Sequence, residues 1–368
     1  MADLTGFTNT GDRLELAWSD GRRDTVYAIW LRDNSPNPDA RHANGQKLFD
    51  ITDIDDTITI DHVTNGGGIV EIRFSPDGHE ARYDIDWLRR NAAPRGAAHL
   101  RRLWGAKLRD AMPAFRFGDV TGDADTKRAW LAAISELGFA LLKETPCEPE
   151  TVCGVAELFG YVRETNYGRF FEVRTEPDPI NLAYTPMGLS CHTDNPYRDP
   201  VPGLQLLHCL VADNDGGESV VVDGFKAAAI LRDEAPDDFG LLTRHAVPFR
   251  FSSDDADLVT RARLISLDDR GDVAEVRFNN RSIGTFDLPA DLMPTFYRAY
   301  RRFAEVLQRP ALEVGFKAGP GDLFIVDNQR VLHGRRTVSG SGRRHLQGCY
   351  ADKDSLESTL RVLERADA

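Results

Sequence analysis

The chain has 368 residues, of which 41% are hydrophobic, so it can form one large and one small domain that each bury a core. Its 58 acidic and 45 basic side chains give a formal net charge of -13 without any block of basic residues, which argues against nucleic acid or an anionic membrane as a partner. No apolar run reaches the roughly 18 residues of a membrane span and the N-terminus resembles no signal peptide, so we expect a cytoplasmic protein.

The cysteines are scattered, odd in number and without a CxxC spacing, which predicts reduced thiols rather than disulfides. The five are Cys147, Cys153, Cys191, Cys209 and Cys349. Cys191 and Cys209 have apolar or strand-like neighbours, so we interpret them as small core residues.

The N-terminal third predicts a small antiparallel β domain. Short alternating runs, separated by Asp-Gly and Gly-Gly-Gly turn signals, predict strands at 13–18, 25–31, 58–60, 69–74 and 81–85, followed by a half-turn at 86–90. Its expected core is Trp18, Ile29, Trp30 and Trp87. The segment 94–118 lacks clear periodicity, so we place the domain boundary there, with domains at 1–105 and 118–368.

The remaining chain predicts many short strands with a few helices. Apolar residues recur at helical intervals in 126–137, 148–160 and 292–308. Strand-like runs lie at 139–142, 203–210, 219–222, 246–251, 264–267, 274–278, 322–326 and 345–351. The pattern favours a mainly β fold with flanking helices, a double-sheet jelly roll.

A candidate metal site begins at His192 and Asp194. Side chains at i and i+2 of an extended segment point the same way, so both can bind one metal ion. His333 follows the apolar run 322–326, and we expect its imidazole at the mouth of the barrel. Two His and one carboxylate leave open coordination positions, as in non-haem Fe(II) oxygenases. The alternatives are a hydrogen-bonded surface pair and, for the third ligand, His345.

Arg343 and Arg344 follow the third candidate ligand. A guanidinium binds a carboxylate through two parallel hydrogen bonds, which lysine cannot do. Either arginine is therefore a candidate for binding the distal end of a dicarboxylate co-substrate.

Several stretches together resemble the gamma-butyrobetaine hydroxylase branch of the Fe(II)/2-oxoglutarate-dependent dioxygenases. They are LSCHTDNPYRDPVPGLQLLHCL, GGESVVVDGF, VDNQRVLHGRR and RRHLQGCYADKDSLESTLRVL, with WLRDNSP and DWLRRN in the small domain. The resemblance implies a double-stranded β-helix with His192, Asp194 and His333 as iron ligands. It also implies that Arg344 binds 2-oxoglutarate, that O2 is the second co-substrate, and that the protein is a homodimer.

The same resemblance implies an aromatic cage for a trimethylammonium group. Aromatic faces attract such cations by roughly 0.5 to 2 kcal/mol each. Matching positions are Tyr167, Phe171, Tyr184 and Tyr350, with Phe171 where the animal enzyme has a tryptophan. The alternative for separated aromatic residues is ordinary core packing.

An anion is expected at the other end of the substrate. The resemblance matches Asn181 to a carboxylate-binding amide, and Asn280 is a second candidate. Asn195 replaces a tyrosine of animal members, and Arg198 and Arg281 lie near these amides in sequence. Extra donors would suit a phosphonate, which keeps open the related 2-trimethylaminoethylphosphonate hydroxylases. Either arginine can equally be a solvated surface charge.

The chain departs from its relatives at their structural zinc site. Many of them use three closely spaced cysteines and a distant histidine, whereas the segment 34–40 here has no cysteine and only His79 matches. Structural zinc requires four ligands, so we expect no zinc. The small domain must then be held by its own core and by contact with a partner.

Two classes of function follow from these residues. The first is Fe(II)- and 2-oxoglutarate-dependent hydroxylation of a small trimethylammonium acid, with gamma-butyrobetaine as the leading candidate and the phosphonate as the alternative. The second is a non-catalytic, cupin-like betaine-binding protein. Arg344 distinguishes them, because a binding module needs no cation for a dicarboxylate co-substrate.

Overall fold

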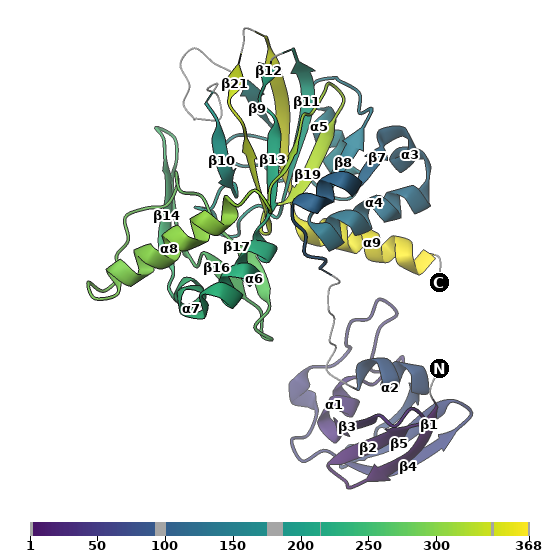
Figure 1. The fold of residues 1–368 in the computed structure, drawn as a ribbon. Helices are drawn as coiled ribbons and strands as arrows, with labels where there is room; N and C mark the ends of the chain where they lie inside the picture. Colours follow the sequence, from purple (N-terminus) through teal and green to yellow (C-terminus); the bar gives the residue numbers. More distant parts are fainter. Residues whose placement is uncertain (1–2, 93–100, 175–186, 214, 340–341, 367–368) are drawn as a thin grey trace. The chain divides into compact units, whose positions relative to one another are not determined.

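The computed structural model describes residues 3–92, 101–174, 187–213, 215–339 and 342–366 (Figure 1). Asn181 and Tyr184 lie outside these residues. Contacts divide the chain into two compact units, Met1–Ala98 and His99–Ala368. The domain limits expected from the sequence, 1–105 and 118–368, stay a prediction. No helix in the described ranges combines the length and the apolar character that a membrane crossing requires.

The antiparallel β structure expected in the first unit is confirmed, but it forms two three-stranded sheets and includes a first strand that was not predicted. One sheet is β1 (Leu4–Asn9), β2 (Arg13–Trp18) and β3 (Arg23–Tyr27); the other is β4 (Thr59–Gly66), β5 (Ile69–Ser75) and β6 (Glu80–Asp84). The helical segments are α1 (Ala28–Asp33), α2 (Ile85–Asn91) and the 3-10 turn η1 (Ile51–Asp53).

The strand predicted at 25–31 is wrong in its second half, where α1 begins at Ala28. Ala28 and Leu31 are both buried, a spacing that suits one face of a helix. Ile29 points away from that face and is 41% exposed, so its placement in the core is also wrong. Trp18 is buried, and the Trp30 and Trp87 rings pack 5.6 Å apart against the core.

Hydrogen bonds hold the segment 34–40, where we expect no zinc. Ser35 is fully buried, and its hydroxyl lies 2.9 Å from His79 Nε2. The Arg41 guanidinium donates to the carbonyl oxygens of Gly45 at 2.8 Å and of Ser35 at 3.4 Å. Burial, and then the charge of Arg32, lowers the pKa of His79 and keeps its ring neutral.

We predict that this unit needs no zinc. Metal analysis of protein purified without chelator should find no stoichiometric zinc, and EDTA should leave the unfolding temperature of this unit unchanged. Zinc at one equivalent, lost together with stability when His79 is replaced by alanine, would contradict the prediction.

The second unit is a jelly roll with flanking helices, so the predicted fold class is confirmed. Its main sheets have the orders β10-β20-β13-β18 and β7-β8-β19-β11-β22-β9. The strands are β7 (Ala114–Arg116), β8 (Phe139–Lys143), β9 (Phe171–Arg174), β10 (Leu189–His192), β11 (Leu204–Ala212), β12 (Asp215–Gly216), β13 (Ser219–Asp223), β14 (Val247–Ser252), β15 (Asp257–Ala262), β16 (Ile265–Leu267), β17 (Val273–Val276), β18 (Val314–Phe316), β19 (Leu323–Asp327), β20 (Val331–Arg335), β21 (Val338–Ser339) and β22 (Arg344–Ala351). The helical segments are η2 (Ala106–Ala111), α3 (Phe117–Gly122), α4 (Ala124–Leu137), α5 (Thr151–Glu157), α6 (Gly224–Glu234), α7 (Pro236–Arg244), α8 (Met293–Leu307) and α9 (Lys353–Ala366).

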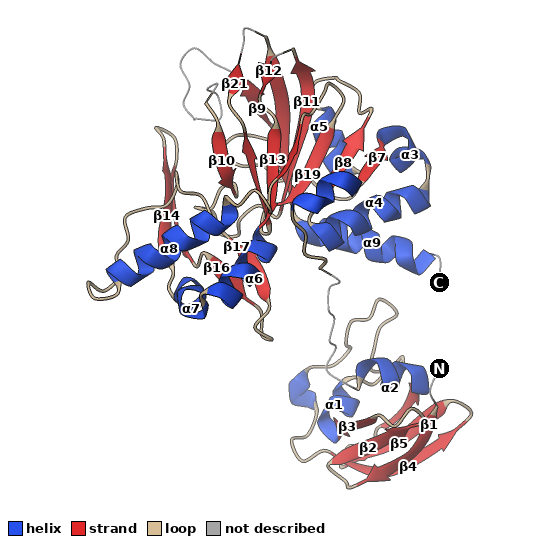
Figure 2. Cartoon of the chain, in the orientation of Figure 1, coloured by secondary structure: helices blue, strands red, loops and turns tan. Residues whose placement is uncertain are grey.

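Three apolar cores organise this unit, and Figure 2 shows the helices and strands that they join. Between the two main sheets lie side chains from both, including Leu207, Val221 and Phe324. On the outer face of the larger sheet a second core joins α4, α5 and α9 to β8, β11 and β19. A third core packs α6, α7 and α8 against the shorter strands β14, β16 and β17. The metal ligands predicted from the sequence belong to the smaller main sheet and its adjoining loop.

A buried ion pair anchors β13 and β20, which lie side by side in that sheet. Arg330 and Asp223 are 1% and 0% exposed. The guanidinium donates from Nε and Nη2 to the two carboxylate oxygens at 3.1 and 3.0 Å. Asp223 also accepts the backbone N–H groups of Trp104 and Phe225. The acceptor positions of this carboxylate are thus used by four donor groups from three parts of the unit.

Candidate active site

Two adjacent strands position the histidines of the predicted metal site. His192 ends β10 and His333 lies within β20, where the two residues are directly opposite in the antiparallel register. The apolar run before His333 is β19 as expected, and His333 itself lies in the next strand, β20, which was not predicted. Gly334 allows the close approach, since a Cβ at this position would lie 2.6 Å from the Leu189 carbonyl oxygen.

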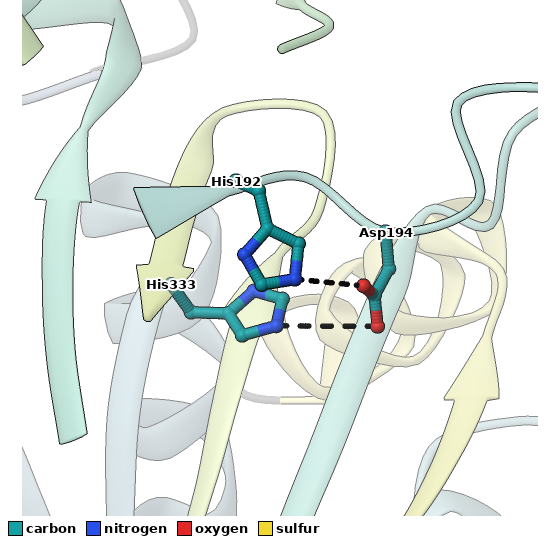
Figure 3. A group of neighbouring side chains, drawn as sticks. All are labelled: His192, Asp194 and His333. Atoms are coloured by element: carbon teal, nitrogen blue, oxygen red, sulfur yellow. Dashed lines mark ion pairs between the residues drawn. The ribbon is translucent and has the colours of Figure 1, made fainter. Parts of the chain in front are cut away.

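Asp194 completes the group from the loop after β10 (Figure 3). Its Oδ1 lies 3.3 Å from His192 Nε2, and its Oδ2 lies 3.9 Å from His333 Nε2. One ligand atom from each residue falls within 4.8 Å of the others, close enough to bind a shared metal ion. Across the ranges that the structure describes, this is the one such group of His, Cys, Asp or Glu side chains.

The donor atoms of the group suit a divalent metal. The Nδ1 of His192 lies 2.9 Å from the Ser190 carbonyl oxygen, which leaves Nε2 available to a metal. Burial and the nearby His192 lower the pKa of His333 to about 3, so its imidazole is neutral. Burial alone would raise the pKa of Asp194, but both imidazoles and the Tyr350 hydroxyl favour the ionised form and hold that pKa well below its usual range. Two imidazoles and one carboxylate fit Fe(II).

Three further residues fix the orientation of Asp194. Asn328, which is 1% exposed, accepts the Asp194 N–H at 2.7 Å and donates to its carbonyl oxygen at 3.0 Å. The carboxylate Oδ2 accepts hydrogen bonds from the Tyr350 hydroxyl at 2.9 Å and from Gln205 Nε2. Both the backbone and the carboxylate of this ligand are therefore held before a metal binds.

A pocket between the two main sheets opens onto the metal group and contains Arg344. It is lined by His192, Asp194, Gln205, Ser219, Arg335 and Arg344, together with apolar side chains. The Arg344 guanidinium makes no hydrogen bond or ion pair with any residue that the structure describes. Burial, and then the nearby Arg335, lowers the pKa of Arg344 to about 10. An unpaired, half-buried cation of this kind suits an incoming carboxylate.

The two alternative residues make contacts away from the pocket. Arg343 is exposed and lies 3.7 Å from Asp213 at the surface. His345 Nε2 contacts the Glu172 carboxylate on the opposite face of β22, away from the pocket. The alternation of a β-strand thus separates Arg344 from both of its sequence neighbours.

Three of the four predicted cage residues lie next to one another. The Phe171 ring is 5.1 Å from the Tyr350 ring and 6.4 Å from the Tyr167 ring. Gly348 faces Phe171 across the β9–β22 register, and a Cβ there would overlap the Phe171 ring. The fourth residue, Tyr184, lies outside the described residues.

The predicted anion-binding residues do not gather at one point. Asn195 is buried next to Asp194 with a positive φ of 51°, and its Oδ1 accepts the Tyr197 hydroxyl at 2.7 Å. The Arg198 guanidinium donates to Asn166 Oδ1 at 2.5 Å.

Asn280 and Arg281 line a second hollow, which shares Leu189 and His192 with the first pocket. Asn280 accepts the Tyr300 hydroxyl at 2.7 Å, whereas the exposed Arg281 guanidinium has no partner in the described part of the chain. Asn181 is outside the described residues.

Sequence reasoning missed Gln205, Asn328, Tyr197 and Phe251. Gln205 is a polar residue in an apolar strand, a signal that could have identified it. Tyr197 connects the Asn195 amide to the Tyr167 hydroxyl, 3.1 Å away, and stacks on Phe251 at 5.2 Å. Neither Tyr197 nor Phe251 has a sequence signal of its own. The β14 strand that carries Phe251 has the pattern of an ordinary strand.

Two family models match the chain over separate ranges. Residues 97–350 match the family described as taurine catabolism dioxygenase TauD, TfdA, and residues 6–89 match the gamma-butyrobetaine hydroxylase-like N-terminal family. A gamma-butyrobetaine dioxygenase of Pseudomonas sp. (strain AK-1) is 38% identical, with 99% of this chain and 97% of the relative covered. The gamma-butyrobetaine dioxygenase of Homo sapiens is 32% identical, with 96% and 94% covered.

A solved structure has the same fold at low sequence identity. AAD-2, in complex with Mn(II) and N-oxalylglycine, superposes with a TM-score of 0.51 at 15% identity. The match covers 68% of this chain and 97% of AAD-2.

Proposed function

This chain belongs to the taurine catabolism dioxygenase TauD, TfdA family and is an Fe(II)- and 2-oxoglutarate-dependent dioxygenase, and we propose that it hydroxylates gamma-butyrobetaine to carnitine. The observation that carries the proposal is the row of aromatic rings, Tyr167, Phe171 and Tyr350, that ends in a hydrogen bond to the metal ligand Asp194. The relatives named gamma-butyrobetaine dioxygenase match over nearly the whole chain and support the same substrate.

The pocket between the sheets is proposed to hold the iron and its co-substrate. His192, Asp194 and His333 would hold Fe(II), which together with 2-oxoglutarate and O2 supplies the oxidising chemistry for an unactivated C–H bond. Arg344 would bind the distal carboxylate of 2-oxoglutarate through two hydrogen bonds. The apolar lining from Leu207, Phe324 and other side chains keeps bulk water away from the reacting groups.

Replacing Arg344 with lysine should raise the concentration of 2-oxoglutarate needed for half-maximal rate about 10- to 100-fold. Lysine keeps the charge but loses the two-point hydrogen bonding, which is worth roughly 1.5 to 3 kcal/mol for a charged group. The KM for the betaine should change little. Arg343→Lys, at the exposed neighbour, is the matched control and should leave both constants unchanged; an equal rise in both constants for Arg344→Lys would contradict the assignment.

The aromatic rings are proposed to receive the trimethylammonium end of the substrate. A quaternary ammonium cannot donate a hydrogen bond, so attraction to ring faces and apolar contact are the interactions available to it. Tyr167, Phe171 and Tyr350 provide three walls, and Tyr184 is the proposed fourth. The hydrogen bond from Tyr350 to Asp194 places this cage beside the iron, where a substrate carbon must lie to be hydroxylated.

The anionic end is proposed to be bound by donors from Asn181, Asn195, Arg198, Asn280 and Arg281. Arg281 supports a second candidate substrate, 2-trimethylaminoethylphosphonate. Its guanidinium has no partner among the described residues and suits a phosphonate, which carries more charge than a carboxylate. The non-catalytic cupin-like alternative does not fit, since the chain belongs to an oxygenase family and retains all three metal ligands.

The deciding experiment compares substrates side by side. Purified protein is supplied with Fe(II), 2-oxoglutarate and O2, and succinate and hydroxylated product are measured with gamma-butyrobetaine, with the phosphonate, and with 5,5-dimethylhexanoate. The last compound replaces the ammonium nitrogen with carbon and is the matched control for the cage. We expect the highest kcat/KM with gamma-butyrobetaine and a loss of at least about tenfold for the uncharged control. Higher kcat/KM with the phosphonate would replace the proposed substrate, and product from none of them would refute it.

We also propose a homodimer in the cytoplasm, as the family resemblance and the sequence suggest. Light scattering at several protein concentrations tests the dimer, and a monomer throughout would refute it.

A further inference from the structure

The two side chains that hold Asp194 Oδ2 are a matched pair from neighbouring strands. Gln205 on β11 and Tyr350 on β22 are directly opposite in the antiparallel register. Side chains at opposite positions project to the same face and lie about 4.5 to 5.5 Å apart at Cβ. Both donate to the same carboxylate oxygen, the hydroxyl at 2.9 Å and the amide through Nε2.

This arrangement distinguishes the two oxygens of the metal ligand. Oδ2 carries two hydrogen bonds from neutral donors, whereas Oδ1 faces His192 Nε2 at 3.3 Å. The carboxylate is therefore prevented from rotating about its Cβ–Cγ bond. Ligand orientation fixed in this way commonly determines how tightly a protein holds its metal.

Tyr350 has a second contact that Gln205 lacks. Its ring packs 5.1 Å from Phe171, in the row of aromatic side chains proposed to receive the substrate cation. One side chain therefore touches the metal ligand with its hydroxyl and forms a wall of the cage with its ring. The Tyr167 hydroxyl, in contrast, lies 3.1 Å from Tyr197 and makes no contact with Asp194.

We propose that Tyr350, together with Gln205, is a positioning residue for the metal ligand Asp194, and that its hydroxyl serves the metal while its ring serves the substrate. The hydroxyl role stands on the contacts of Asp194 alone. The ring role rests on the proposed function, because it assumes a trimethylammonium substrate.

The test titrates three variants of the full chain with Co(II). Calorimetry and the visible spectrum of the bound ion measure the binding. Tyr350→Phe removes the hydroxyl and keeps the ring, and Gln205→Met removes the other donor at similar volume. Tyr167→Phe is the matched control, because it removes a cage hydroxyl that does not reach Asp194. We expect Co(II) affinity to fall about 10- to 100-fold in the first two variants and to stay within about twofold in the control.

Either of two results would overturn the proposal. One is unchanged Co(II) affinity in Tyr350→Phe, and the other is a loss in Tyr167→Phe as large as in Tyr350→Phe. Circular dichroism confirms folding of each variant, and Gln205→Met decides alone if Tyr350→Phe does not fold.

A kinetic comparison separates the two roles of Tyr350. Tyr350→Phe should lower kcat and keep the KM for gamma-butyrobetaine within about twofold, whereas Tyr350→Leu, which also removes the ring, should raise that KM about tenfold. Equal KM values for the two variants would refute the ring role. If the wild-type protein does not turn over gamma-butyrobetaine, the proposed substrate fails, but the Co(II) comparison still tests the hydroxyl role.

Discussion

Asp194→Ala should reduce turnover by about 10³-fold or more. This residue is the only carboxylate of the metal group, and its removal leaves two imidazoles that bind a divalent cation weakly. Several kcal/mol of catalytic stabilisation depend on the metal, and each 1.36 kcal/mol corresponds to about tenfold in rate. Succinate formation from 2-oxoglutarate measures the loss of turnover, and Co(II) titration of the same sample measures the loss of metal.

The matched control for this substitution is Asp213→Ala. Asp213 belongs to the same unit but is an exposed carboxylate that faces Arg343 at 3.7 Å. The Asp213→Ala variant should keep full activity and full Co(II) affinity. Activity retained by Asp194→Ala would show that the metal ligands have been assigned to the wrong residues.

Asp223→Asn should destabilise the second unit by about 3 to 5 kcal/mol. Both members of the Arg330–Asp223 pair are buried, and loss of the carboxylate charge leaves the guanidinium without its counter-charge in the interior. The Asp223 carboxylate now accepts four hydrogen bonds. Asparagine replaces one of its oxygens with an NH2 group, which cannot accept, so at least one of the four buried donors loses its partner. Urea unfolding would measure the loss of stability. Amide hydrogen exchange in residues 219–223 and 331–335 would show where the structure opens.

Glu305→Gln provides the comparison for the buried pair. Glu305 pairs with Arg301 at 2.9 Å on the surface of α8, and exposed helical pairs contribute little to stability. Its urea midpoint should match that of the wild-type protein. A shift for Asp223→Asn no larger than the shift for Glu305→Gln would show that the buried pair is not a major source of stability.

Much of the second unit was predictable because its elements have strong local patterns. The short strand-like runs at 219–222 and 322–326 became β13 and β19, and the helical spacing at 292–308 became α8. The helices α6, α7 and α9 were not predicted, since the residues 224–244 and 353–366 were not assigned a period. In the small domain, the short apolar run at 28–31 fits a strand and a helix equally well, and burial of Ala28 with Leu31 decided for the helix.

The site was predictable where chemistry restricts the residue type. Only a few side chains bind Fe(II), so a His-x-Asp motif and a distant His could be identified before the strands were known. Gln205 and Asn328 escaped notice, because amides support other residues and have no spacing of their own. Tyr350 was predicted as a wall of the cage, but its hydrogen bond to Asp194 depends on the β11–β22 register, which sequence patterns do not specify.

The pairing of β10 with β20 has a consequence for the synthesis of the protein. His192 and Asp194 leave the ribosome long before His333, and Arg344 and Tyr350 follow later still. Since domains fold as units once their long-range strand pairs can form, the iron site cannot assemble on a partial chain. The three metal-binding side chains can therefore come together only after most of the chain has been synthesised.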